Sequence, residues 1–165
     1  MPIHWPPPGT LREHSLPMGQ VRVCDQPALI RCRGLGSCVG LFLHDRLRGT
    51  GGGAHIVLPG NWGLPEESGE WLSAESALGE LVGQLATLGS PAAGLRAKLV
   101  GGANLFGSVG NIGEQNVRRT KKLLQQAGIY LAAEAVGGQA GRSVTFHTSS
   151  GQLYLRSATG AGQVI

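Results

Sequence analysis

The chain has 165 residues, of which 15% are charged and 41% are hydrophobic, and its formal net charge is +4. This length suits one domain with its own core, and the low charge density excludes the dense cationic surface of a nucleic-acid-binding protein. No apolar segment approaches the roughly 20 residues of a membrane span, and the three cysteines form no C-x-x-C pair and no zinc-site spacing. We therefore expect a soluble, cytoplasmic protein that binds no metal.

The N-terminal segment differs in composition from the rest of the chain. Its first 17 residues contain five of the nine prolines and show no hydrophobic periodicity. This composition predicts a flexible, Pro-rich tail over residues 1–17 and a single domain over residues 18–165. The 28 glycines of the chain predict many tight turns between short strands.

The first half of the domain has the pattern of strands. Alternating polar and apolar residues predict strands near 21–23 and 28–30, and an almost continuous apolar run predicts a buried strand over 39–44. The glycine-rich segment 45–53 is predicted to be a turn, and a strand over 54–58 is expected to end at a proline.

Two helices are predicted in the second half. Ser73 is expected to cap a helix that ends near Leu88, and a second helix is expected over 113–127. Further strands are predicted over 95–100, 129–136, 143–147 and 152–156. Because most strands are grouped rather than alternating with helices, we expect an α+β fold in which packed β-sheets carry helices on one side.

Cys38 is the first candidate for a catalytic residue. It follows the glycine-rich segment 34–37 and begins the predicted buried strand. Glycines at such a turn let a substrate approach the backbone closely, and two successive backbone N–H groups there can form an oxyanion hole. The alternative is a purely structural role, because free cysteine is among the most buried residue types.

His55 is the candidate base for this thiol. It lies 17 residues after Cys38, and an antiparallel return would bring both residues to the same end of neighbouring strands. There an imidazole can accept the thiol proton, giving a thiolate that attacks a carbonyl. His44 is excluded as the base because it ends the strand that Cys38 begins, about 20 Å away. A hydrogen-bonded strand histidine without a catalytic role is the alternative for His55.

The segments GLGSCVG at 34–40 and GGAHIVLP at 52–59 resemble CheD, the chemoreceptor glutamine deamidase family of bacterial chemotaxis. The resemblance continues through 98–106, 112–117 and 134–144, so that it covers most of the chain outside the tail. It implies a cysteine hydrolase, without a cofactor, that converts receptor glutamines to glutamates. The family's nucleophile falls on Cys38 and its general base on His55.

The same resemblance implies a thioester mechanism and a fold similar to that of the cytotoxic necrotizing factor toxins. The thiolate of Cys38 would attack the carboxamide carbon, and backbone N–H groups near Ser37 and Cys38 would stabilise the oxyanion. Protonated His55 would then give a proton to the departing ammonia. The partners that the resemblance implies are the cytoplasmic helices of chemoreceptors and, in some members, the phosphatase CheC.

Two residues depart from the family pattern. The smaller departure is Ala135, where an acidic residue usually follows the glutamate that aligns with Glu134. The departure that matters more is Cys32, which stands where the family commonly has a threonine that helps to hold the histidine. A thiol is a weaker hydrogen-bond partner than a hydroxyl, so Cys32 predicts poorer orientation of His55. Three hypotheses stay open: an active enzyme, a slower enzyme, and a catalytically inactive adaptor that binds receptors or CheC. A reversible Cys32–Cys38 disulfide is a further alternative, provided that the Cα atoms lie within about 7 Å.

Two other interpretations also stay open. The basic residues of the second helix are predicted to form its solvated face, with docking of acidic receptor helices as the alternative. These residues are Arg118, Arg119, Lys121 and Lys122. A general cysteine amidase with another protein substrate is the remaining functional hypothesis.

Overall fold

Two five-stranded sheets make up most of the structure. The computed structural model describes residues 11–62, 70–105, 107, 111–160 and 162–165. One sheet, which we call the outer sheet, has the strand order β1-β3-β8-β9-β10, and the other, the central sheet, has the order β2-β5-β4-β6-β7. The strands of the outer sheet are β1 (Arg12–Ser15), β3 (Ala28–Leu35), β8 (Arg142–His147), β9 (Leu153–Ser157) and β10 (Gly162–Val164). Those of the central sheet are β2 (Val21–Cys24), β5 (Thr50–Ile56), β4 (Val39–Asp45), β6 (Leu95–Gly101) and β7 (Tyr130–Val136).

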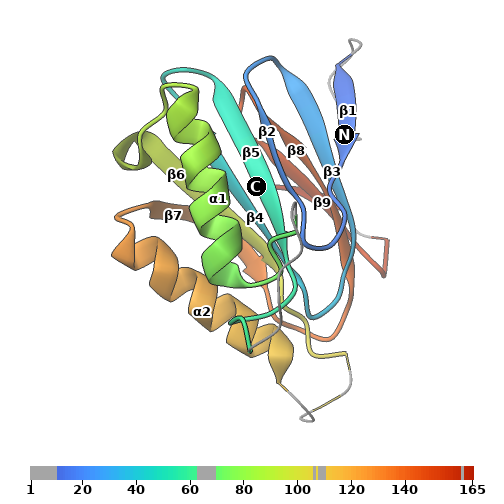
Figure 1. Cartoon of the computed structure of the whole chain (residues 1–165). Coiled ribbons are helices and arrows are strands. Elements are labelled where there is room, and N and C mark those ends of the chain that lie inside the picture. Colours follow the sequence, from blue (N-terminus) through green and yellow to red (C-terminus); the bar gives the residue numbers. More distant parts are fainter. Residues whose placement is uncertain (1–10, 63–69, 106, 108–110, 161) are drawn as a thin grey trace.

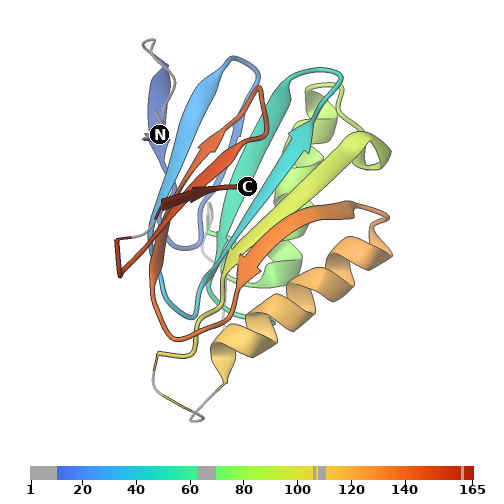
Figure 2. The same ribbon diagram turned by 180° about the vertical axis from the view of Figure 1, so that it is seen from behind.

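Two α-helices cover the face of the central sheet that points away from the outer sheet (Figures 1 and 2). They are α1 (Ala74–Thr87) and α2 (Ile112–Gln126), and a short 3-10 helix, η1 (Ala92–Gly94), precedes β6. Ser73 caps α1 by accepting a hydrogen bond from the backbone N–H of Ser76 at 3.2 Å. Both predicted helices are confirmed to within about one residue at each end. Within the described residues, no helix has both the length and the apolar character needed to cross a membrane.

The side chains of the central sheet alternate between two apolar layers. Leu41 and Leu43 of β4 pack toward the helices. Phe42 packs toward the outer sheet, with its ring centroid 5.1 Å from that of Phe146 in β8. Because neighbouring residues of a strand point to opposite faces, a strand between the two layers is buried on both, as β4 is along its whole length. The prediction of an α+β fold with packed sheets and helices on one side is confirmed.

The prediction of a flexible tail over residues 1–17 is wrong for residues 12–15, which form the edge strand β1. This strand runs parallel to β3, and Leu16, which follows it, is only 2% exposed between the two sheets. All four residues of β1 are polar, so hydrophobic periodicity carries no signal there. The pairing depends on a partner strand elsewhere in the chain. Residues 1–10 of the predicted tail lie outside the described residues.

The predicted turn over residues 45–53 is wrong for its second half, where β5 begins and includes three consecutive glycines. A Cβ atom on Gly51 would lie 2.7 Å from the carbonyl oxygen of Thr148. One on Gly52 would lie 2.7 Å from the carbonyl oxygen of Arg22. Both distances are too short for a real side chain, so these glycines allow close packing of the strand rather than a reversal of the chain.

Candidate active site

The register of β4 and β5 places His55 near the start of β4, next to the bend that holds Cys38. The two strands are antiparallel, with Gly40 directly opposite His55. Cys38 lies in the bend just before β4, two residues ahead of Gly40, and packs against the apolar layer between the two sheets that also contains Cys32. His55 faces the same layer, whereas its neighbour Ile56 points toward the helices.

The outer sheet contributes the third candidate residue. Cys32 lies in β3, is completely buried, and places its Sγ 3.3 Å from Nδ1 of His55. The structure therefore brings the residue at the family's threonine position into contact with the candidate base. All three cysteines of the chain are free thiols, so the Cys32–Cys38 bridge is not formed.

A backbone carbonyl is the stronger partner of the histidine. The oxygen of Leu16 lies 2.9 Å from Nδ1 of His55, and the N–H of Leu16 in turn donates to the carbonyl of Arg31 in β3 at 2.8 Å. Because a carbonyl can only accept, the proton of the neutral imidazole is on Nδ1, and Nε2 carries the lone pair. The sulfur of Cys32 is then a second, weaker acceptor for the same N–H.

Sequence reasoning missed Leu16 because it assigned this residue to the tail. A backbone carbonyl leaves no mark on residue type, so a single sequence carries no direct signal for such a partner. The only trace is one large apolar side chain immediately before Pro17. That side chain anchors the segment between the sheets and brings its carbonyl to the histidine.

Burial keeps His55 neutral with one nitrogen available. The residue is 2% exposed, and burial lowers the pKa of its imidazole, an effect that the Leu16 carbonyl partly offsets. Nε2 is buried and has no hydrogen-bond partner among the described residues. The lone pair on Nε2 is therefore free to accept a proton from a group that approaches it.

The two thiols near this histidine are both protonated at rest. Burial raises the pKa of Cys38, and the residue's own backbone N–H partly offsets this by interacting with the sulfur. Burial raises the pKa of Cys32 to about 12, with the nearby Cys38 as a second cause. Cys38 is only partly buried, whereas Cys32 is sealed between the sheets. Of the two, Cys38 is thus the thiol that a substrate can reach.

The basic residues of α2 are mostly paired within the chain. Arg118 pairs with Glu114 on the same helix. Arg119 lies 3.1 Å from Glu75 of α1. Lys121 lies 2.7 Å from Glu134 of β7. Three of the four positive charges are therefore partly neutralised by neighbours, which fits a solvated helix face better than a docking surface.

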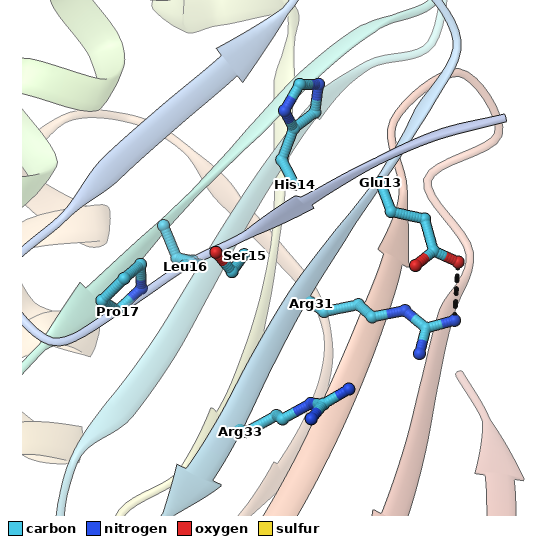
Figure 3. A pocket seen from close by; sticks show the side chains of 7 residues that line it. All are labelled: Glu13, His14, Ser15, Leu16, Pro17, Arg31 and Arg33. Carbon is cyan, nitrogen blue, oxygen red and sulfur yellow. Dashed lines mark hydrogen bonds and ion pairs between the residues drawn. The ribbon is translucent and has the colours of Figure 1, made fainter.

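A surface cavity of about 430 Å³ lies beside the candidate site, along β1 and β3 (Figure 3). Arg31 pairs with Glu13 at 2.8 Å. Figure 3 marks this pair with a dashed line and shows the side chain of Arg33 next to that of Arg31. Leu16 lines the cavity, whereas Cys38 and His55 do not. The cavity is thus a neighbour of the thiol–imidazole pair rather than part of it.

Comparison with known proteins finds relatives along most of the chain. The family model described as CheD chemotactic sensory transduction matches residues 58–157. The chain is 38% identical over 148 residues to the chemoreceptor glutamine deamidase CheD of Thermotoga maritima, covering 89% of this chain and 93% of that protein. It is 37% identical over 146 residues to the chemoreceptor glutamine deamidase CheD of Halalkalibacterium halodurans, covering 85% and 90%. Among solved structures, the hypothetical protein YfiH of Bacillus licheniformis aligns with a TM-score of 0.46 and 14% identity, over 74% of this chain and 58% of that one.

Proposed function

The chain belongs to the CheD family, and from this premise we propose that it is a cysteine hydrolase that deamidates glutamine side chains of chemoreceptors to glutamates in the cytoplasm. The observation that carries the proposal is the state of His55, whose Nδ1–H binds the Leu16 carbonyl and whose buried Nε2 has no hydrogen-bond partner among the described residues. Cys38 packs against the same layer between the sheets as Cys32, which contacts His55. Both residues precede the segment that the family model matches, so their catalytic roles rest on this geometry.

The reaction begins with a neutral thiol and a neutral imidazole. Because burial raises the pKa of Cys38 and lowers that of His55, a resting thiolate–imidazolium pair is disfavoured. Nε2 accepts the thiol proton as Sγ bonds to the carboxamide carbon of the glutamine. The imidazolium that forms is stabilised by its Nδ1–H···O contact with Leu16, in the way that a third residue supports the base of other hydrolases.

The second half of the reaction releases ammonia and then glutamate. The backbone N–H groups of Ser37 and Cys38 stabilise the tetrahedral oxyanion. The Nε2 proton passes to the amide nitrogen as the C–N bond breaks, leaving a thioester on Cys38. A water molecule, deprotonated by the same nitrogen, then attacks the thioester and restores the thiol, so that the net change is amide plus water to acid plus ammonia.

The replacement of threonine at position 32 does not remove the orienting acceptor of the histidine. The Leu16 carbonyl lies closer to Nδ1 than the Cys32 sulfur does, at 2.9 Å against 3.3 Å. Oxygen is also the better acceptor. This supports the active enzyme over the second candidate, an inactive adaptor that binds receptors or CheC.

Mass spectrometry of a receptor cytoplasmic fragment tests the proposed function. Wild-type protein is expected to add about one dalton for each glutamine that it converts, and Cys38→Ala is expected to add none. Cys24→Ala is the matched control, because this partly buried free thiol lies in β2, outside the candidate site. Mass gain that persists in Cys38→Ala would refute the cysteine mechanism. Binding of receptor or CheC without any mass gain in wild type would identify the adaptor instead.

A further inference from the structure

One side chain of α2 connects the two chain segments that carry the candidate catalytic residues. Asn116 is completely buried. Its Nδ2 donates to the carbonyl of Ser37 at 2.9 Å and to the carbonyl of Val57 at 3.0 Å. Ser37 immediately precedes Cys38, and Val57 lies two residues after His55. A single amide group therefore joins the nucleophile segment to the end of the strand that carries the base.

We propose that Asn116 is a positioning residue of the active site, which fixes the Ser37–Cys38 peptide and holds it against the end of β5. The inference deepens the proposed function and rests on it for the catalytic roles of Cys38 and His55. It also gives a role to the segment 112–117, no residue of which takes part in the proposed reaction steps.

Peptide geometry explains what this contact does to the nucleophile. The carbonyl of Ser37 and the N–H of Cys38 belong to one planar trans peptide, so they point in opposite directions. By binding the carbonyl, Asn116 sets the direction of the Cys38 N–H. That N–H lowers the pKa of the Cys38 thiol and belongs to the proposed oxyanion hole.

The neighbouring peptides of the same segment are also held. The N–H of Ala103 donates to the carbonyl of Gly36, and the N–H of Gly102 donates to the carbonyl of Cys38, both at 2.8 Å. Three successive carbonyls before and at the nucleophile are thus occupied. Asn116 supplies the middle bond, and it is the only one of the three that a side-chain substitution can remove.

The start of α2 is fixed against these same residues. A Cβ atom on Gly113 would collide with the carbonyl oxygen of Ala103 and would lie 2.6 Å from that of Gly102. The helix therefore touches the backbone of the 102–103 segment directly, which fixes where Asn116 enters the site. The hydroxyl of Thr120 donates to the backbone carbonyl of Asn116 at 2.7 Å, within the helix.

The chemistry of the two contacts requires an amide nitrogen at this position. Both partners are carbonyls, which only accept, so the side chain must offer two donors from one atom. An aspartate offers none and a serine offers one. The Oδ1 of Asn116 is buried without a partner among the described residues, which costs stability. The free energy lost by burying this oxygen is consistent with a residue whose role is to set the geometry of the site and not only to stabilise the fold.

The test compares Asn116→Ala and Asn116→Ser with wild type in receptor deamidation. Loss of both donors in Asn116→Ala is expected to lower kcat by about 10- to 100-fold, with KM within about two-fold, because misplacement of reacting groups affects the chemical step. Asn116→Ser offers at most one donor, on a side chain one atom shorter, so it cannot hold both carbonyls and its kcat is expected to lie between those of Asn116→Ala and wild type. Thermal unfolding checks that each variant is folded. If Asn116→Ala does not fold, the serine variant decides, and a wild-type kcat in it overturns the proposal.

The pH dependence of Cys38 alkylation by iodoacetamide gives a readout that needs no receptor. In Asn116→Ala the Ser37–Cys38 peptide can rotate, so the Cys38 N–H no longer lowers the pKa of the thiol. The thiolate then forms at higher pH, and the profile of alkylation rate against pH is expected to move to higher pH. A Cys24→Ala background removes labelling of the other partly exposed thiol. A shifted profile supports the positioning role even if wild type deamidates nothing, which would refute only the proposed function.

Thr50→Val is the matched control for both measurements. It removes a buried hydroxyl that lies 2.6 Å from Ser90 Oγ, at the opposite end of β5 from His55. It is expected to lower the melting temperature while leaving kcat and the alkylation profile unchanged. The proposal is overturned if folded Asn116→Ala has the wild-type kcat and the wild-type profile, or if Thr50→Val changes both as strongly.

Discussion

At the scale of single residues, the candidate active site depends on a backbone atom as much as on its side chains. The carbonyl of Leu16 places the proton of His55 on Nδ1, and the lone pair of Nε2 has no partner in the part of the chain that the structure describes. A carbonyl is present whatever side chain the residue carries, so this contact tolerates substitution nearby. The thiol of Cys32 also lies 3.3 Å from Nδ1 of His55. Of the two acceptors of this N–H it is the weaker, so a thiol in place of a hydroxyl at position 32 leaves the main contact, with Leu16, unchanged.

Substitution of Cys32 is therefore expected to change the rate only modestly. In Cys32→Ala the Leu16 carbonyl still binds Nδ1–H, so we expect kcat for deamidation to fall by less than about ten-fold, the worth of one ordinary hydrogen bond. Cys32→Thr, which offers a better acceptor, is expected to equal or exceed wild type. Both are measured by the mass gain of a receptor fragment over time. A loss in Cys32→Ala as complete as in Cys38→Ala would show that the thiol itself is required.

At the scale of elements, the central position of β5 depends on its consecutive glycines. This strand lies between β2 and β4, beneath α1 on one face and the outer sheet on the other. A Cβ on Gly52 would meet the backbone carbonyl of Arg22 and also approach Leu81 of α1 within 2.9 Å. A backbone atom cannot move away as the end of a flexible side chain can, so the glycines set the spacing around the strand that carries His55.

Two glycine-to-alanine substitutions are expected to have opposite effects on stability. Gly52→Ala forces β5 away from β2 and is expected to lower the free energy of unfolding by about 1–3 kcal/mol. Gly83→Ala, in the interior of α1 with nothing within 4 Å of its added Cβ, is expected to raise it by about 0.5–1 kcal/mol. Urea denaturation of the two variants beside wild type measures both. Equal effects of the same sign would contradict this account of the β5 glycines.

At the scale of the whole molecule, the packing of the two sheets buries two histidines in their neutral form. Burial lowers the pKa of His55 and that of His44, whose Nε2 contacts the carbonyl of Ser149 at 3.0 Å. In the unfolded chain both imidazoles titrate near the ordinary value of 6.5. Below that pH the unfolded state binds protons that the folded state does not, so the contribution of these residues to stability is full above pH 6.5 and is lost as the pH falls through the folded pKa.

The free energy of unfolding is therefore expected to fall as the pH is lowered from about 6.5 to about 5. Urea titrations at a series of pH values measure this slope. His55→Gln removes one of the two groups, so its slope should be smaller than that of wild type even though the variant is less stable at every pH. The His44→Gln variant should lose its own share, and the double variant both. If the unfolding free energy of the double variant changed with pH as strongly as that of wild type, groups other than these two histidines would cause the pH dependence.

Much of the local structure could be predicted from the sequence. Ser73 and the apolar positions after it indicate α1 correctly, because a cap and a helical periodicity act within a few residues. The continuous apolar run at 39–44 indicates the buried strand β4 for the same reason. The edge strands β1 and β10 were not indicated, since their few and mostly polar residues are strands only beside their partners.

The amino-acid sequence by itself determined which residues carry the candidate chemistry, Cys38 and His55, and the local elements that present them. Only the tertiary structure decided what holds these residues, since Leu16 reaches His55 across 39 positions of the chain and Asn116 reaches Ser37 across 79. The reason is physical: propensities and caps act between near neighbours, whereas a hydrogen bond between distant segments exists only after two sheets and a helix have packed together.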